Sequence, residues 1–307
     1  MTNAIAGNVW ALPLETDIIV WLQSLGGKGS FLYYLMNFFS MFGKEIVVFF
    51  VVLALFGPDK QGGRRIALTM FLAFIGNCLI KNIFCRERPF NSDRRIQNLR
   101  DESGYSFPSG HSMLAASVYP QATLQLKNKR AKTVWTSVAA AVALLVALSR
   151  MYVGAHYLTD VVCGLALGFA AMLTAELLCR LKRNYLVWAG LLVVGFAGFF
   201  YCDSSDFFTG YGALLGFVAG MIFDDKVVRF APTKVWWRIL LRALGGLGIF
   251  LGLNTLLKLP FSSLIETNAV FERYFRVARY AVCVFLVVGV YPMCFALLQK
   301  RPSVDEQ

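Results

Sequence analysis

Long apolar runs recur along the whole chain, and each is close to the ~20 residues that a membrane-spanning helix needs. The pattern predicts spans at residues 31–57, 64–85, 110–127, 133–151, 156–179, 186–201, 207–223, 238–258 and 277–298. The sixth and seventh runs are short and rich in glycine, so their ends are the least sharply defined. We therefore expect an all-α integral membrane protein, a bundle of about nine transmembrane helices.

Composition agrees with lipid as the solvent. Of the 307 residues, 57% are hydrophobic and the mean hydropathy is +0.59, whereas soluble domains are about 45–50% apolar. No soluble domain is visible, and the N-terminus lacks the basic region and cleavage site of a secretory signal, so we expect no cleaved peptide. Residues 14–25 predict either an interfacial amphipathic helix or a short element packed on the bundle. The seven cysteines show no CxxC spacing, which indicates buried free thiols and supports neither a disulfide framework nor a metal site.

Lysine and arginine are concentrated in alternate loops. The richer set contains Lys60, Arg64, Arg65, Lys127, Lys129, Arg130, Lys132, Arg180, Lys182, Arg183, Lys226, Arg229, Lys234, Arg238, Lys300 and Arg301. The positive-inside rule places this set in the cytoplasm, with the N-terminus outside and the C-terminus inside. The net charge of +12 is then mainly a topology signal and a contact with anionic lipid headgroups. Nucleic-acid binding is excluded, because the basic residues lie in short loops and not on one continuous face.

Three short stretches bring together the residues of a phosphoryl-transfer site. They are Lys81 with Arg88-Pro89, then Pro108-Ser109-Gly110-His111, then Ser149-Arg150 with His156 and Asp160, and they contain both histidines of the chain. In the orientation given above, all three lie at the outer ends of spans and at one depth. An ionisable group near lipid costs about 2.5–3.5 kcal/mol on insertion scales, so this convergence favours a functional site.

The residue types suit phosphoryl transfer without a metal. Arg88 and Arg150 offer planar forks for phosphate oxygens, and Lys81 adds a point charge. One imidazole can attack phosphorus while the other protonates the leaving oxygen. His156 and Asp160 are four residues apart and would share one face of a helix. The carboxylate can then accept a hydrogen bond from one ring nitrogen and leave the other free to attack.

The stretch Ser109-Gly110-His111 opens a predicted span. Its backbone N–H groups would be the unpaired ones of a helix start, which favours an anion. Gly110 allows close approach of a phosphate, and Ser109 adds a hydroxyl donor.

Each of these features alone also has a structural interpretation. A membrane histidine usually makes an interhelical hydrogen bond, a helix-end arginine usually reaches to headgroups, and Pro-Ser-Gly turns open many helices. The combination favours a site. Four other outer arginines are expected to be solvated loop charges or a weak landing patch for an acidic substrate: Arg86, Arg94, Arg95 and Arg100. Glu45 either has a function within the membrane or forms a structural pair with Lys44 or an arginine.

The pattern K-x6-R-P, P-S-G-H and S-R-x5-H-x3-D resembles the signature of the type 2 phosphatidic acid phosphatase family. The chain matches it without a departure, over roughly residues 31–180. The resemblance implies a helical core, a phosphohistidine intermediate on His156, His111 as general acid and Asp160 as the orienting carboxylate. It also implies a phosphate pocket made of Lys81, Arg88, Ser109, Gly110 and Arg150. That family uses no metal and no cofactor.

We expect three regions: an outer or interfacial segment at 1–30, a catalytic helical core at 31–180, and additional transmembrane helices with a short cytoplasmic C-terminus at 181–307. The nine-span layout with the N-terminus outside resembles the branch that contains glucose-6-phosphatase and the sphingoid-base phosphate phosphatases. The last four predicted spans carry no recognisable catalytic motif.

The expected function is a metal-independent phosphoric monoester hydrolase that acts on a lipid phosphate at the outer membrane–water interface. Phosphatidate-like lipids, sphingoid phosphates, phosphatidylglycerol phosphate and polyprenyl diphosphate are all candidate substrates, so monophosphate and diphosphate stay open. One alternative is a sugar-phosphate phosphatase of the glucose-6-phosphatase type. Another is a non-catalytic transporter of lipid or phosphate, which would predict broken helices with polar residues at the midplane. The sequence leaves open the oligomeric state and the choice between a bacterial plasma membrane and an endoplasmic reticulum membrane with a lumenal site.

Overall fold

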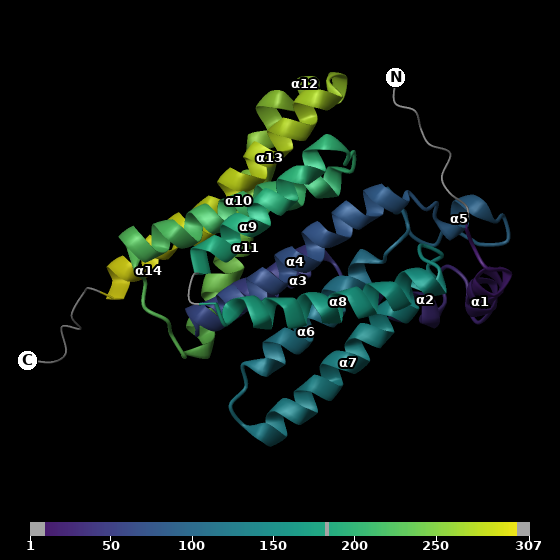
Figure 1. The fold of residues 1–307 in the computed structure, drawn as a ribbon, viewed down its shortest axis with the longest axis horizontal. Helices are drawn as coiled ribbons and strands as arrows, with labels where there is room; N and C mark the ends of the chain where they lie inside the picture. Colours follow the sequence, from purple (N-terminus) through teal and green to yellow (C-terminus); the bar gives the residue numbers. More distant parts are fainter. Residues whose placement is uncertain (1–9, 182–183, 300–307) are drawn as a thin grey trace, which may run out of the picture. The chain divides into compact units, whose positions relative to one another are not determined.

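In the computed structural model, every regular element among the described residues, 10–181 and 184–299, is a helix (Figure 1). The predicted all-α membrane fold is therefore confirmed. Four basic residues of the predicted cytoplasmic loops, Lys182, Arg183, Lys300 and Arg301, lie outside the described residues. The chain divides into two compact units. The first comprises Met1–Val51, Arg64–Asn184 and Gly198–Ser204, and the second comprises Val52–Gly63, Tyr185–Ala197 and Ser205–Gln307.

The first unit holds all the residues of the predicted site. Its helices are α1 (Pro13–Ser24), α2 (Phe31–Met41), most of α3 (Glu45–Phe56), most of α4 (Lys60–Phe84), α5 (Pro89–Ser92), α6 (Gly110–Leu124), α7 (Lys129–Tyr152) and α8 (Leu158–Cys179).

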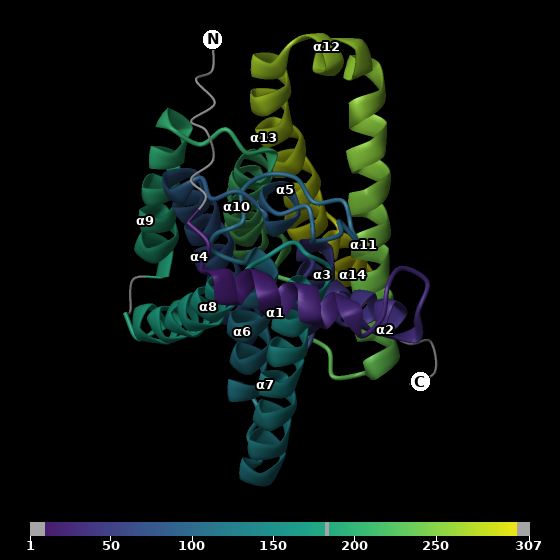
Figure 2. The same ribbon diagram turned by 90° about the vertical axis from the view of Figure 1, so that its right-hand side faces the viewer.

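The second unit contains most of α9 (Asn184–Phe196) and the first residue of η1 (Ala197–Phe200). It continues with α10 (Ser205–Phe223), η2 (Asp224–Val228), α11 (Trp236–Lys258), η3 (Leu259–Phe261), α12 (Ser262–Thr267), α13 (Ala269–Phe285), η4 (Leu286–Val290) and α14 (Pro292–Gln299). Within this unit α11 and α13 run side by side and are joined through α12 (Figure 2).

The predicted number of nine spans is not confirmed. Among the described residues, six helices are long and apolar enough to cross a membrane, or seven if the pair α2 and α3 counts as one span. That pair, predicted as a single run at 31–57, is bent by 49°. The run predicted at 110–127 forms only the 15 residues of α6, which at about 1.5 Å per residue is shorter than the ~30 Å hydrocarbon layer. The run predicted at 186–201 is likewise a shorter apolar helix, Tyr185–Phe200.

Glycines on α8 bring its backbone close to α6. A Cβ atom added at Gly164 would lie 2.6 Å from the carbonyl oxygen of Ser109, and one at Gly168 would lie 2.3 Å from that of Met113. Small residues four positions apart are the usual means of close helix contact in membranes. The backbone N–H of Ser109 consequently donates to the carbonyl of Asp160 at 3.0 Å, which ties the two helix starts together.

Glycines play the same part between α10 and α13 in the second unit. A Cβ atom at Gly212 would lie 2.4 Å from the carbonyl of Val277, and one at Gly216 would lie 2.3 Å from that of Ala281. Gly212 and Gly216, in the run predicted at 207–223, are therefore packing positions of a long helix.

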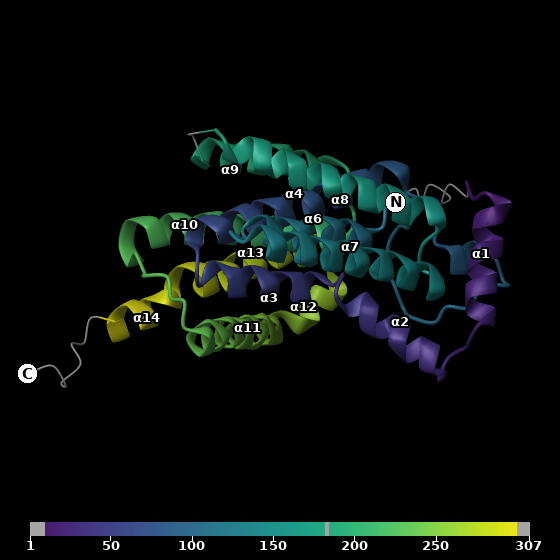
Figure 3. The same cartoon turned by 90° about the horizontal axis from the view of Figure 1, so that it is seen from below.

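The helix α1 crosses the end of the first unit, roughly perpendicular to α7 and α8 (Figures 2 and 3). Its buried face includes Ile19 and Leu22, which pack in one cluster with Met151 and Tyr152. The predicted helix at 14–25 is thus packed on the bundle, and Glu15 lies on its buried face.

Candidate active site

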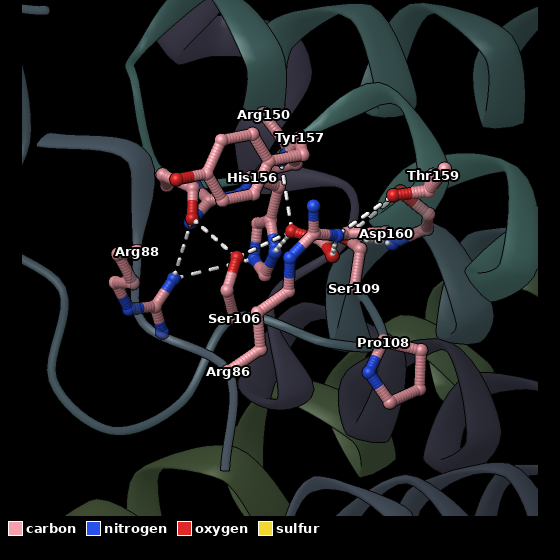
Figure 4. Close-up of polar contacts among 12 residues, drawn as sticks. Arg86, Arg88, Ser106, Pro108, Ser109, Arg150, His156, Tyr157, Thr159 and Asp160 are labelled. Carbon is pink, nitrogen blue, oxygen red and sulfur yellow. Dashed lines mark hydrogen bonds and ion pairs between the residues drawn. The ribbon is translucent and has the colours of Figure 1, made fainter. Parts of the chain in front are cut away.

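The predicted site residues meet at one end of the first unit. They come from the end of α4, the segment between α4 and α5, the start of α6, and the junction of α7 and α8. Figure 4 shows several of these side chains pointing toward one another around His156. The charges of Lys81 and Arg150 reach both imidazoles. Residues far apart in the sequence therefore form one cluster, as the sequence predicts.

His156 lies in the short connection between α7 and α8, and its side chain is buried. Its two ring nitrogens face different groups. Nδ1 lies 3.6 Å from Oδ2 of Asp160, and Nε2 lies 3.3 Å from Nη1 of Arg88. Burial, and then the positive charges of Arg88, Arg150 and Lys81, lower the pKa of His156 well below its usual value of 6.5. The imidazole is therefore neutral near pH 7, with a lone pair available to a phosphorus atom.

The proximity of His156 and Asp160 does not come from a shared helix face, as the spacing argument supposed. The helix α8 begins at Leu158, two residues after the histidine. Asp160 instead caps that helix, because its Oδ2 accepts the backbone N–H of Tyr157 at 2.8 Å. Gly154 turns the chain between the two helices with φ of +78°, and a Cβ atom there would lie 2.7 Å from the carbonyl of Gln97. Glycine is thus required at this turn both by conformation and by space.

Asp160 is fully buried and accepts from three donors. Oδ1 accepts from Nη1 of Arg86, while Oδ2 accepts from the hydroxyl of Ser106 and from the N–H of Tyr157. Ser106 was not singled out in the sequence, since a serine in a loop carries no signal of its own. These donors fix the carboxylate against the Nδ1 side of His156 (Figure 4).

Arg88 is held by the carbonyl groups of two loops. Its Nε and Nη2 donate to the carbonyls of Gly104 and Ser103 at 3.0 and 2.7 Å, and Nη1 donates to that of Ala155 at 3.1 Å. The guanidinium is 3% exposed, so its charge acts on His156 with little screening by water.

Arg150 lies in the last turn of α7 and is completely buried. Its Nη1 donates to the hydroxyl of Ser40 at 2.8 Å, and its Nη2 lies 2.8 Å from Oε1 of Glu102. Arg100 contacts the same two partners, with Nη1 on Ser40 at 2.9 Å and Nε on Glu102 at 3.3 Å. Glu102 was not predicted as a site residue, yet its carboxylate contacts one of the expected phosphate-binding cations.

The residues at the start of α6 contact other parts of the first unit. The Ser109 hydroxyl caps the helix by accepting from the N–H of Ser112, so its oxygen is already engaged. Gly110 faces Asn77, whose Oδ1 would lie 3.0 Å from an added Cβ atom. His111 packs against the bend between α2 and α3, where a Cβ atom at Gly43 would lie 2.5 Å from its own Cβ. Its Nε2 is buried and makes no hydrogen bond with any described residue.

Two of the four outer arginines that were expected to be solvated are not. Arg94 and Arg95 are exposed, as predicted. Arg100 is partly buried between Ser40 and Glu102. Arg86 is 1% exposed and forms an ion pair with Asp160, so the prediction was wrong for the residue closest to the predicted catalytic group.

Glu45 lies at the start of α3, and its side chain is exposed. Its charge acts on Lys44 and on Arg150.

Two family models match this chain. The model of the PAP2 superfamily matches residues 62–185, and the model described as a PAP2 superfamily phosphatase transmembrane extension matches residues 208–302. The chain belongs to the PAP2 superfamily. The first match contains all eight predicted site residues, Lys81, Arg88, Ser109, Gly110, His111, Arg150, His156 and Asp160. The second match lies within the second unit, which holds none of them.

This chain is similar to three curated proteins, among others. The chain is 47% identical over 73 residues to phosphatidylglycerophosphatase B of Bacillus subtilis, which covers 22% of this chain and 36% of that protein. It is 30% identical over 138 residues to undecaprenyl-diphosphatase of Sulfolobus acidocaldarius, covering 44% and 64%. It is 26% identical over 171 residues to dolichyldiphosphatase of Saccharomyces cerevisiae, covering 54% and 69%. These matches span between about a third and about two thirds of the relatives' own lengths.

Proposed function

We propose that this PAP2 chain is a membrane phosphatase that hydrolyses a lipid phosphate at the outer membrane–water interface through a phosphohistidine on His156. The observation that carries the proposal is the orientation of the His156 ring. Nδ1 faces the buried carboxylate of Asp160 at 3.6 Å, and Nε2 faces the cation of Arg88 at 3.3 Å. A nucleophilic imidazole needs this arrangement, with a carboxylate on the proton side and a phosphate-binding cation on the attacking side.

The reaction has two displacements. In the first, the lone pair of His156 Nε2 attacks phosphorus while the bond to the leaving oxygen breaks, and His111 in its protonated form donates a proton to that oxygen and becomes neutral. In the second, a water molecule attacks the phosphohistidine and gives a proton to His111. The P–N bond breaks, its electron pair returns to Nε2, and inorganic phosphate leaves. Lys81, Arg88 and Arg150 neutralise the phosphoryl oxygens in both steps.

We propose that no metal ion takes part. The charge that a divalent cation would supply is provided by three cations whose fields reach the nucleophile. In the described ranges, 10–181 and 184–299, no group of three His, Cys, Asp or Glu side chains is arranged to hold a metal. Ser109 and Gly110 complete the pocket at the start of α6.

The distribution of charge supports an extracytoplasmic site. Within the first unit, the basic residues near the start of α4, between α6 and α7, and at the end of α8 lie at the helix ends opposite to the site. The positive-inside rule puts those ends in the cytoplasm. The substrate would then come from the outer leaflet, or from the lumenal leaflet in an endoplasmic reticulum membrane.

A lipid substrate is favoured over a soluble sugar phosphate. The relatives are named as enzymes of phosphatidylglycerophosphate, undecaprenyl diphosphate and dolichyl diphosphate. A non-catalytic transporter is disfavoured, because the polar groups cluster at one end of the helices and not at their midpoint. The proposal covers both monophosphates and diphosphates.

Release of inorganic phosphate by the purified protein in detergent micelles tests this proposal. The panel contains phosphatidate, phosphatidylglycerol phosphate, a sphingoid phosphate, a polyprenyl phosphate and diphosphate, and glucose 6-phosphate. We expect hydrolysis of at least one lipid and none of the sugar phosphate, and loss of turnover by several orders of magnitude in His156→Ala with thermal unfolding unchanged. Hydrolysis of glucose 6-phosphate and of no lipid would contradict the lipid substrate. Full activity in His156→Ala would contradict the assignment of His156 as the nucleophile.

A further inference from the structure

Arg86 occupies a buried cage built from two segments of the first unit, residues 10–15 and residues 157–160. Its Nη1 donates to Asp160 and, at 2.7 Å, to the hydroxyl of Thr159. Its Nη2 donates to the carbonyl of Trp10 at 2.8 Å and to Oε2 of Glu15 at 3.0 Å. The guanidinium also lies 4.0 Å from the ring centroids of both Trp10 and Tyr157. An arginine at 1% exposure with two carboxylate partners and two aromatic faces is fixed in one position.

Glu15 reaches this cage from α1, the helix that crosses the end of the first unit. Its carboxylate is 2% exposed, and besides Arg86 it accepts from the N–H and the hydroxyl of Thr159 at 2.7 and 2.6 Å. Burial opposes ionisation, but the bonds from Thr159 and Leu12 and the charge of Arg86 outweigh it and lower the pKa of Glu15. Glu15 is therefore a carboxylate at neutral pH.

The charges in this row alternate. Asp160 and Arg86 alone would sum to zero, so the field of Asp160 at His156 would be largely cancelled. Glu15 adds one negative charge and returns the row of Glu15, Arg86 and Asp160 to a net charge of −1. When His156 bonds to phosphorus, its ring becomes cationic, and a net negative row next to Nδ1 stabilises that state.

We propose that Glu15 and Arg86 are positioning residues of the phosphatase site. The ion pair with Arg86 favours the charged form of Asp160 and holds it toward His156, and Glu15 offsets the charge of Arg86 so that the carboxylate still acts on the ring. The segment that begins with α1 is thus part of the active site. This inference rests on the phosphohistidine function proposed above, and it adds two residues that the family signature does not contain.

The test compares Glu15→Gln in two backgrounds. In a chain with no other substitution, Glu15→Gln should lower kcat roughly tenfold with little change in KM, because a negative charge close to the nucleophile is lost. It should also move the acid limb of kcat/KM to lower pH, because losing a negative charge lowers the pKa of His156. In an Arg86→Met background the sign should reverse. Without the guanidinium between them, the carboxylates of Glu15 and Asp160 repel each other. In the Arg86→Met background, Glu15→Gln should therefore raise kcat several-fold.

Controls separate this role from a merely structural one. Asp17→Asn removes a carboxylate from the exposed face of the same helix, where it pairs with Arg95, and should leave kcat and the pH profile unchanged. Arg86→Lys retains the charge and should recover part of the activity that Arg86→Met loses. If Arg86→Met does not fold, Glu15→Gln beside Asp17→Asn still decides the question through the acid limb.

Equal losses from Glu15→Gln in both backgrounds, or a lowered melting temperature with unchanged kcat and pH profile, would overturn the inference. Phosphate release by the wild type reports separately on the proposed function.

Discussion

Glu102 occupies the partner position that a substrate phosphate needs on Arg150. Its Oε1 lies 2.8 Å from Nη2 of Arg150, a fully buried cation assigned to phosphate binding. A phosphate that binds Arg150 must displace this carboxylate or share the guanidinium with it. We therefore predict that Glu102→Gln strengthens substrate binding.

The magnitude follows from the type of bond that is replaced. Hydrogen bonds that involve a charged group contribute about 1.5–3 kcal/mol. The bond between the Glu102 carboxylate and Arg150 belongs at the upper end of this range, and the bond from a neutral glutamine amide to the same cation belongs at the lower end. The difference of about 1–1.4 kcal/mol corresponds to roughly a five- to tenfold change in affinity. Arg150, Arg88 and Arg100 together outweigh burial and lower the pKa of Glu102, so it stays charged below its ordinary value of 4.5. The effect should consequently be constant from about pH 5 to pH 8.

The assay measures KM for the lipid phosphate and the inhibition constant of inorganic phosphate in detergent micelles. Both should fall roughly five- to tenfold in Glu102→Gln, with kcat within about twofold of the wild type. Asp101→Asn is the matched control, because it removes a charge from the neighbouring exposed position, whose carboxylate contacts Asn98 and not Arg150. A raised KM in Glu102→Gln would refute this reasoning. It would indicate that Glu102 positions the Arg150 side chain for phosphate binding.

Three further predictions concern the pH profile, metal dependence and sidedness. The acid limb of kcat/KM, which reports His156 in the free enzyme, should lie well below pH 6.5, and Arg88→Gln should move it to higher pH because a neighbouring cation is removed. Activity should be complete in excess EDTA and inhibited by vanadate, whereas an absolute requirement for Mg²⁺ would contradict the proposed chemistry. In a cysteine-free background, a cysteine at Ser103 should react with an impermeant thiol reagent on intact cells or sealed right-side-out vesicles, and one at Thr133 only after permeabilisation. A reversed labelling pattern would place the site on the cytoplasmic leaflet.

The sequence predicted which residues meet, because two simple constraints act on them. Apolar runs fix which segments cross the membrane, and the basic loops fix which ends lie on the same side. Lys81 and Arg150 lie in the last turns of α4 and α7, and His111 lies in the first turn of α6, so alternation of the chain direction brings all three to the same side. The predicted number of nine spans is not confirmed among the described residues, since an apolar run such as 110–127 does not show that its helix starts at Gly110 and ends at Leu124.

The partners of the site residues could not be predicted in the same way. Arg86 looks like a loop charge in the sequence, and its burial depends on Glu15 and Asp160, which are 71 and 74 positions away. Ser106 and Glu102 likewise gain their importance only from contacts with distant residues. Such contacts depend on how α1 and the loop before α6 fold over the helix ends. The pattern at residues 14–25 indicates a helix but not which residues it contacts, and the loop before α6 has no periodic pattern.

The central claim is a covalent phosphate on His156, and trapping that intermediate tests it most directly. The enzyme is mixed with a lipid substrate labelled on its terminal phosphate, quenched in alkali within milliseconds, and digested for mapping of the labelled residue. We predict an alkali-stable, acid-labile phosphate on His156, accumulating further in His111→Gln when the leaving group needs no protonation, because breakdown then lacks its base. Steady turnover with no label on His156, or label retained by His156→Ala, would contradict the account.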